Sequence, residues 1–277
     1  RHIIGGYMKK GNKNLILFSI VFVLIIGIIY MWNINMGKTS RQVKETISFL
    51  EELSEIGAIN GEIVPVASDI QEVKTSSNGN ATVGYTLKWH NCGVDLDKNY
   101  NVIGFLEQTT TKTGETVLSE EQCIDYAEKY LKHILDNDFE LKEVLECEKN
   151  EPFYTINFYR YHRKYINYDD IITVKINKYS GELVGFSALN TDNVEYQSFM
   201  RTRKSEAKKI AREYLEFIGL SGDLINDDMG YFTTEEKIST LSYIFNYEIT
   251  KGDNEGKICT IIISGNDGTV VKHSIKQ

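Results

Sequence analysis

The most distinctive polar feature of the sequence is a run of basic and aromatic residues, Phe158-Tyr-Arg-Tyr-His-Arg-Lys-Tyr165. Side chains alternate between the two faces of a β-strand, so Phe158, Arg160, His162 and Lys164 would share one face and the intervening residues the other. Tyrosine and arginine are favoured anchors at protein interfaces, and on an acidic chain such a hairpin is suited to an acidic segment of a partner. The candidate partner-binding residues are Phe158, Arg160, Tyr161, His162, Arg163 and Tyr165. The structural alternative is a strand whose Arg160 pairs within its own unit and whose tyrosines cover a helix.

Two adjacent carboxylates follow this run, at Asp169 and Asp170. They serve a turn entering the next strand, pair with the basic residues before them, or act as acid and base in an enzyme. Acid–base catalysis requires both groups to lie in a cleft, with at least one raised pKa.

Recognisable catalytic motifs do not form a consistent set. HExxH, GxSxG, GxGxxG and the P-loop are all missing from the sequence. Ser205-Glu-Ala-Lys208, Ser76-Ser-Asn78 and Lys112-Thr-Gly114 match the three elements of penicillin-binding enzymes, but their order along the chain is wrong. Ser205 is also explained as the N-cap of a helix. We therefore expect a protein that is not an enzyme.

Two segments resemble fragments of metal sites. His90-Asn-Cys92 offers two ligands without a third nearby. The alternating acidic segment from Asp95 to Asn101 has the spacing of a calcium loop, but it lacks the glycine and the final glutamate that such a loop needs. A strand and a turn explain both segments, so we expect no metal and no cofactor. The sequence leaves open whether any of Cys92, Cys123, Cys147 and Cys259 pair.

The elements that would position these residues repeat along the chain. Ser119-Glu-Glu-Gln122 predicts a capping box, followed by an amphipathic helix with Cys123 on its apolar face. Strands are predicted at about 140–147, 153–162 and 170–176, followed by a turn ending at Gly181 and a strand at 182–188. A second helix opens at Ser205, with strands at about 240–249 and 257–264, a turn ending at Gly268 and a strand at 269–274.

The spacing of these landmarks indicates an internal repeat. The two helix starts are 86 residues apart, and the two turn glycines are 87 apart. A weaker first copy has Val43, Ile47, Leu50 and Leu53 on its helix. Its Val102-Ile-Gly-Phe105 matches Leu183-Val-Gly-Phe186, but Tyr100 occupies the turn position where the other copies have glycine.

Tandem helix-then-strands units of this length resemble the PepSY-like superfamily, including the YcdB/YcdC repeat proteins and the C-terminal region of the germination protein YpeB. The resemblance rests on Ser119–Ala127 and Ser205–Ala211, on Phe158-Tyr-Arg160 followed by Tyr168-Asp-Asp-Ile-Ile-Thr-Val, and on the turns at Gly181 and Gly268. It covers 118–277 well and 40–117 poorly, and Cys123 stands where the family usually has alanine. It implies an α+β fold with each helix packed on an antiparallel sheet.

The segment from Leu15 to Trp32 is long and apolar enough to cross a membrane. As a helix it would span about 27 Å, close to the hydrocarbon thickness of a bilayer. A buried helix or a cleaved signal peptide are the alternatives, but no small-residue cleavage pattern follows. Arg1, Lys9, Lys10 and Lys13 precede the run, which places the N-terminus in the cytoplasm and the rest outside.

The charge of the remaining chain narrows its partners. Four of the 31 Lys and Arg precede the apolar run, so the remaining 27 face 39 Asp and Glu, a formal charge of −12. This balance argues against binding nucleic acid or anionic polymers. Gly5-Gly6-Tyr7-Met8 could be encoded by a ribosome-binding sequence before ATG, so we expect translation to start at Met8.

The predicted organisation is a cytoplasmic N-terminus at 1–13, a membrane anchor at 14–33 and three PepSY-like modules at 34–117, 118–200 and 201–277. The resemblance implies a regulatory protein that holds or inhibits a hydrolase or protease of the bacterial cell envelope. Two alternatives remain: an extracytoplasmic enzyme with a site at Asp169 and Asp170, and an accessory subunit of a membrane signalling kinase. Oligomeric state, the partner's identity and any role in sporulation or germination stay open.

Overall fold

The computed structural model describes residues 40–74, 83–108, 117–135, 138–145, 151–188, 194–233 and 237–276. The predicted anchor at Leu15–Trp32, the motifs at Ser76–Asn78 and Lys112–Gly114, and Cys147 lie outside these residues. No helix in the described part of the chain combines the length and the apolar character that a membrane crossing requires.

The described elements form three successive units, each with a helix followed by antiparallel strands. The first contains α2 (Arg41–Glu55), the short 3-10 helix η1 (Gly61–Ile63), β1 (Gln71–Lys74), β2 (Tyr85–Trp89), β3 (Cys92–Leu96) and β4 (Val102–Glu107). The second contains α3 (Glu120–Ile134), β5 (Phe139–Leu145), β6 (Phe153–His162), β7 (Tyr165–Asn177) and β8 (Leu183–Ser187). The third contains α4 (Lys204–Phe217), β10 (Gly222–Thr233), β11 (Ile238–Ile249), β12 (Ile258–Ser264) and β13 (Val270–Lys276). Between the second and third units lies β9 (Glu195–Gln197), which pairs with β11.

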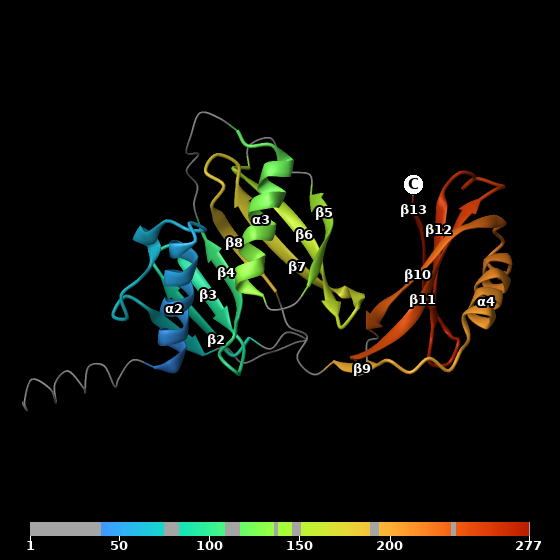
Figure 1. Ribbon diagram of the computed structural model, residues 1–277, viewed down its shortest axis with the longest axis horizontal. Helices are drawn as coiled ribbons and strands as arrows, with labels where there is room; N and C mark the ends of the chain where they lie inside the picture. Colours follow the sequence, from blue (N-terminus) through green and yellow to red (C-terminus); the bar gives the residue numbers. More distant parts are fainter. Residues whose placement is uncertain are drawn as a thin grey trace, which may run out of the picture.

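The first two units share one sheet, because β4 pairs with β8 across their boundary. Strand order along this sheet is β1-β2-β3-β4-β8-β7, and β6 and β5 extend it beyond β7. Both α2 and α3 cover the same face of this sheet, as Figure 1 shows. In the sheet, β10 of the third unit pairs with β7 at one position, a parallel bridge between Tyr231 and Asn167.

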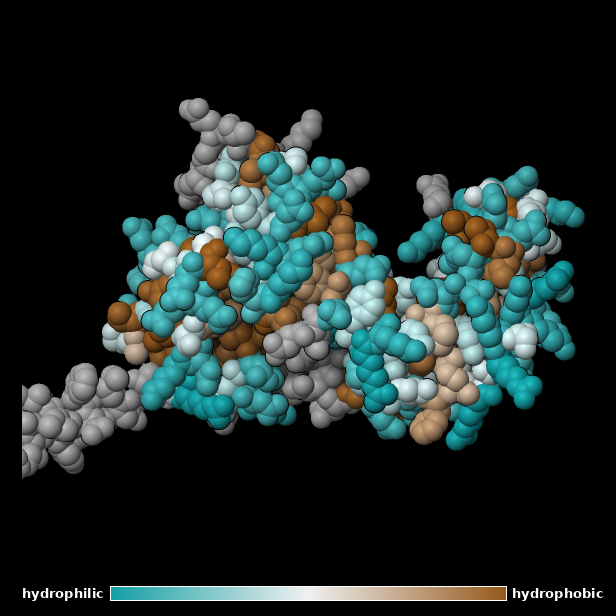
Figure 2. All heavy atoms as spheres, viewed as in Figure 1, coloured by the Kyte–Doolittle hydropathy of each residue, from teal (hydrophilic) through white to brown (hydrophobic). Residues whose placement is uncertain are grey.

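Two large hydrophobic cores and one small cluster correspond to this arrangement. The small cluster of Phe232, Ile244 and Ile262 contacts Tyr168 of β7, so it lies where the second and third units meet. One core is shared by the first two units and contains Leu50, Leu53, Tyr130, Leu131 and Phe186. A separate core in the third unit packs the apolar face of α4 against β11 and β12. The face in Figure 2, on which α2 and α3 lie, is largely hydrophilic, with apolar side chains along the junction of the first two units. The first and second units therefore fold around a common interior.

Helix starts follow the sequence prediction in one case and depart from it in another. Ser119 forms the predicted capping box, accepting from the Gln122 amide while the Gln122 side chain accepts from the Ser119 amide. Ser205 was expected to cap α4, and this is wrong: the helix begins at Lys204, and Arg203 occupies the N-cap position without a side-chain cap. Serine is a favoured N-cap residue, but its type alone does not show whether it stands at the N-cap or within the first turn of the helix.

The turn before the last strand of each unit contains a residue in the left-handed conformation in all three copies, although the first turn is one residue shorter than the other two. Gly181 and Gly268 have φ of 77° and 74°, and Tyr100 adopts the same left-handed conformation with φ of 73°. Each turn begins with a polar side chain that accepts from backbone amides two to four residues ahead: Asp97, Asn177 and Ser264. The shared left-handed residue and the polar side chain that opens each turn agree with the internal repeat, most closely in the second and third copies.

Alanine at Gly181 is expected to destabilise the shared core far more than alanine at Gly57. Both glycines have φ above 70°, which costs a non-glycine residue about 1–2 kcal/mol. A Cβ at Gly181 would also lie 2.7 Å from Cε2 of Tyr126, whereas nothing lies within 4 Å of one at Gly57. Overpacking adds about 1–3 kcal/mol at Gly181.

The fluorescence of Trp89, which is buried in the shared core, reports unfolding in urea and checks this difference. Equal losses of unfolding free energy in the two variants would contradict the close contact with Tyr126.

Candidate functional site

The basic and aromatic run forms the end of the β6–β7 hairpin, with Arg163 and Lys164 in its turn. Phe158 is fully buried in the shared core and Arg160 is 6% exposed. The expectation that these two side chains contact a partner is therefore corrected, because they share the face of β6 that lies against the interior. Tyr161, His162 and Tyr165 are partly exposed and Arg163 is exposed.

The outer end of this hairpin packs against the third unit of the same chain. His162 stacks on Tyr196 with ring centroids 3.6 Å apart, and the edge of Tyr231 meets both rings. The Tyr231 hydroxyl lies 2.8 Å from Oγ of Ser198, to which Arg163 also donates. Burial lowers the pKa of His162, and the charge of Arg163 lowers it further. The outer end of the hairpin therefore connects the second and third units.

Asp169 and Asp170 lie in the same bulged part of β7 but have different partners. Oδ2 of Asp169 accepts from the Thr233 amide, 2.6 Å away in β10. Asp170 is buried, and its Oδ2 lies 3.7 Å from Nη1 of Arg160. Burial raises the pKa of Asp170, and the charge of Arg160 partly offsets this. Each carboxylate thus has a structural partner, one joining two units and one neutralising a buried arginine.

The segments that resemble metal sites also have structural roles. Asp97 organises its turn by accepting from the amides of Asn99 and Asn101, and Asp95 accepts from the Thr86 hydroxyl. His90 is exposed at the β2–β3 turn, while Cys92 is buried. Within the described ranges no three His, Cys, Asp or Glu residues are grouped as metal ligands.

A groove with a volume of about 590 Å³ lies on the helix-free face of the shared sheet. Strand pairing arranges its floor as two rows that each cross β2, β3, β4, β8 and β7. One row is Thr86, Asp95, Gly104, Ser187 and Thr173. The other row is Lys88, Gly93, Leu106, Gly185 and Lys175. The groove exists only because β4 and β8 join two units.

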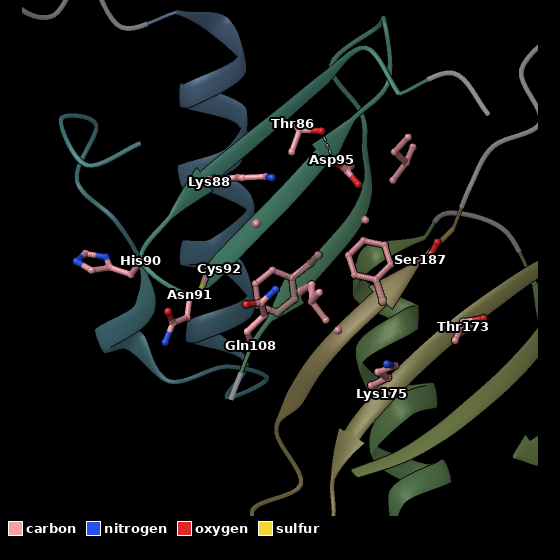
Figure 3. A pocket seen from close by; sticks show the side chains of 17 residues that line it. Thr86, Lys88, His90, Asn91, Cys92, Asp95, Gln108, Thr173, Lys175 and Ser187 are labelled. Carbon is pink, nitrogen blue, oxygen red and sulfur yellow. Dashed lines mark hydrogen bonds between the residues drawn. The ribbon is translucent and has the colours of Figure 1, made fainter. Parts of the chain in front are cut away.

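Small residues in the middle and polar residues at the ends give the groove its shape. Gly93, Gly104 and Gly185 belong to three adjacent strands, and Leu106 is 43% exposed among them. Figure 3 shows Thr86 and Asp95 pointing toward each other, while His90 lies at the outer end and points away. The arrangement suits binding along the sheet surface.

Reactivity at the rim is low. Burial, followed by the charge of Glu107, raises the pKa of the Cys92 thiol to about 11. A thiol with such a pKa is protonated at neutral pH and is a poor nucleophile. The groove chemistry is therefore that of noncovalent binding through hydroxyls, lysines and an apolar centre.

Sequence reasoning did not find this groove. Its lining residues are spread from Thr86 to Ser187, and their alignment depends on the pairing of β4 with β8. One signal was present: Val102-Ile-Gly-Phe105 and Leu183-Val-Gly-Phe186 place a glycine at the same position of two matching strands. That match predicted a repeat, but it did not show that Gly104 and Gly185 would lie on adjacent strands of one sheet.

Comparison with known proteins agrees with this architecture. Residues 117–186 match the PepSY family model, described as peptidase propeptide and YPEB domain. This segment of the chain is PepSY-like. Its structure is similar to the C-terminal domain of YpeB from Bacillus megaterium, with a TM-score of 0.50 and 18% sequence identity, over 75% of this chain and 89% of that one. At this identity the likeness shows the fold alone, and no curated protein matches the sequence.

The PepSY match confirms the predicted superfamily resemblance, and the three helices with their large sheet confirm the predicted α+β class. The PepSY segment also supplies part of the groove, since it includes β7 and all of β8 except Ser187. The other groove strands come from the first unit, which lies before the matched residues.

Proposed function

We propose that this chain is a non-catalytic regulatory protein that holds or inhibits a hydrolase or protease of the cell envelope. Leu15–Trp32 anchors it in the cell membrane, with the N-terminus in the cytoplasm and the three units outside. The proposal is supported mainly by one observation: the segment matching a peptidase-propeptide family forms one side of a groove that the first unit completes. A groove that depends on two units is suited to recognising a folded partner or one of its segments.

The anchor separates this proposal from the signalling-kinase alternative. A tether only has to keep the groove outside the membrane, so an unrelated membrane helix in place of residues 1–39 should preserve function. A kinase subunit that signals through its own helix would lose function in the same exchange.

Cross-linking of the tagged chain in intact cells of its own species tests the proposal. We expect the native chain and the anchor-exchanged chain to capture the same envelope hydrolase or protease, and the purified chain to change that enzyme's activity. Capture of a kinase that is lost on anchor exchange would overturn the proposal. So would a captured hydrolase whose activity, stability and location are all unchanged by the chain.

A further inference from the structure

We propose that the groove on the helix-free face binds an extended acidic segment of the partner, lying across the five strands β2, β3, β4, β8 and β7. This inference deepens the proposed function and depends on it, because it names the surface and the chemistry by which the regulated enzyme is recognised. The floor, the dimensions and the charges of the groove each contribute to it.

The glycine floor is not required by the fold at two of its three positions. A Cβ at Gly93 would lie 3.6 Å from the Leu87 carbonyl oxygen, and one at Gly104 would lie 3.5 Å from Cβ of Asp95, which are ordinary contacts. Neither glycine has a positive φ. Glycine inside a strand costs about 0.5–1 kcal/mol relative to alanine, and it often marks a close approach by a ligand or another backbone.

The dimensions of the groove favour an extended segment over a helix. Five strands spaced about 4.8 Å apart give the rows a length of about 19 Å. Adjacent rows are two residues apart along each strand, so the floor is about 7 Å wide. An extended chain of about six residues fits this trough, whereas a helix has a diameter of about 10–12 Å.

The charges define which side chains such a segment would carry. Lys88 and Lys175 occupy the two ends of one row, and Leu106 lies midway between them. Nζ of Lys175 lies 4.7 Å from the centre of the Phe153 ring, which orients that lysine. An extended ligand with an acidic residue at each end and an apolar residue in the middle would match the row, about three residues separating each acid from the centre.

A protein segment fits this row better than a continuous polyanion does. The apolar Leu106 side chain occupies the middle of one row, where a polyanion would place further charge, and the uncharged hydroxyls of Ser187 and Thr173 lie toward one end of the other row. The carboxylate of Asp95 would repel a polyanion. The chain as a whole has a formal charge of −8, so the two lysines are local exceptions that steer an acidic segment to this face.

Fluorescence anisotropy with the full chain in detergent or nanodiscs tests the inference. The probe is a labelled peptide, Glu-Ser-Thr-Leu-Thr-Ser-Glu, and its comparison peptide has the same composition with both glutamates at one end. We expect the first peptide to bind at least tenfold more tightly. The double variant Lys88→Glu/Lys175→Glu should lose at least tenfold in affinity and should gain affinity for a peptide with lysine at both ends.

Variants of the groove floor and of lysines far from the groove distinguish binding in the groove from a general effect of charge. Gly104→Trp fills the floor and should abolish peptide binding, while Lys44→Glu/Lys208→Glu changes exposed lysines of α2 and α4 and should leave it unchanged. Circular dichroism confirms that each variant is folded. The double lysine variant decides the question if Gly104→Trp does not fold.

The remaining outcomes distinguish failure of the groove as a binding site from failure of the proposed function. Equal binding of the two peptides, or equally tight binding of inorganic polyphosphate, would show that the groove does not recognise an extended acidic segment. If the groove variants still capture the envelope enzyme in cells, the regulator remains and this surface is discarded. If peptide binding is specific but no enzyme is captured or affected, the proposed function fails and the groove stands alone.

Discussion

Arg160→Ala is expected to destabilise the shared core by about 3–5 kcal/mol, because it leaves the buried Asp170 carboxylate without its partner cation. Arg163→Ala should change stability by less than about 0.5 kcal/mol, since Arg163 is exposed in the hairpin turn. Urea unfolding followed by Trp89 fluorescence measures both. The combined variant Arg160→Met/Asp170→Leu should recover most of the loss, because an apolar pair replaces both charges.

The loss of unfolding free energy caused by Arg160→Ala is also expected to become smaller as the pH falls. Burial already raises the pKa of Asp170, and removing Arg160 raises it further. A carboxyl group with a raised pKa binds its proton more tightly in the folded chain than in the unfolded chain, so acidification through that pKa favours folding. A loss of unfolding free energy that stayed constant or grew as the pH was lowered through the pKa of Asp170 would contradict the assignment of Asp170 as the uncompensated charge.

Tyr231→Ala is expected to release the third unit from the second while both cores remain folded. Tyr231 is 1% exposed, and its ring and hydroxyl connect His162, Tyr196 and Ser198. Loss of a buried aromatic side chain costs about 3–5 kcal/mol. Other contacts also join the units, among them the Asp169–Thr233 hydrogen bond and the stacked rings of Tyr168 and Phe232. Because Tyr231 lies in this junction and not in the core of either unit, its loss should appear as separation of the units.

Electron–electron distances between spin labels at positions 133 and 209, on the exposed surfaces of α3 and α4, measure that separation. We expect a broad, longer distribution in Tyr231→Ala and a narrow one in Tyr231→Phe, which loses only the hydroxyl. A distribution unchanged in the alanine variant would show that other contacts hold the units together.

Local patterns in the sequence were sufficient to predict most of the second unit. The helical spacing of Cys123, Ala127, Tyr130 and Leu131 gave a helix whose buried face is confirmed. The turn at Gly181 has the predicted position, and a left-handed residue recurs at Tyr100 in a turn one residue shorter, although the residue type differs. A turn forms there because Asp97 supplies the hydrogen bonds.

Elements that depend on distant partners were missed. Residues 222–233 carry several Asp and Asn residues, which are poor strand formers, yet they form β10 because β11 pairs along nearly its whole length. The burial of Arg160 was also missed, since its partner Asp170 becomes close only after the β7 bulge forms. The structural alternative for Arg160, a pair within its own unit, is the one that the structure supports.

The structure gives the β6–β7 hairpin a different role from the one that the sequence indicated. A row of basic and aromatic side chains suggested a surface for another protein, but His162 and Tyr231 use the same chemistry to join two units. The lysines that line the groove are Lys88 and Lys175, about 90 residues apart in sequence and on opposite sides of it. The two lysines face the same groove because β4 pairs with β8.

Site-specific photo-cross-linking in intact cells tests the central claim most directly. A photoreactive residue replaces Gln108, which is exposed at the rim of the groove, and in a matched chain it replaces His133, which is exposed on α3. We predict that position 108, and not position 133, cross-links to an acidic segment of an envelope hydrolase or protease. Cross-linking of such an enzyme only from position 133, or of no protein from position 108, would contradict the account.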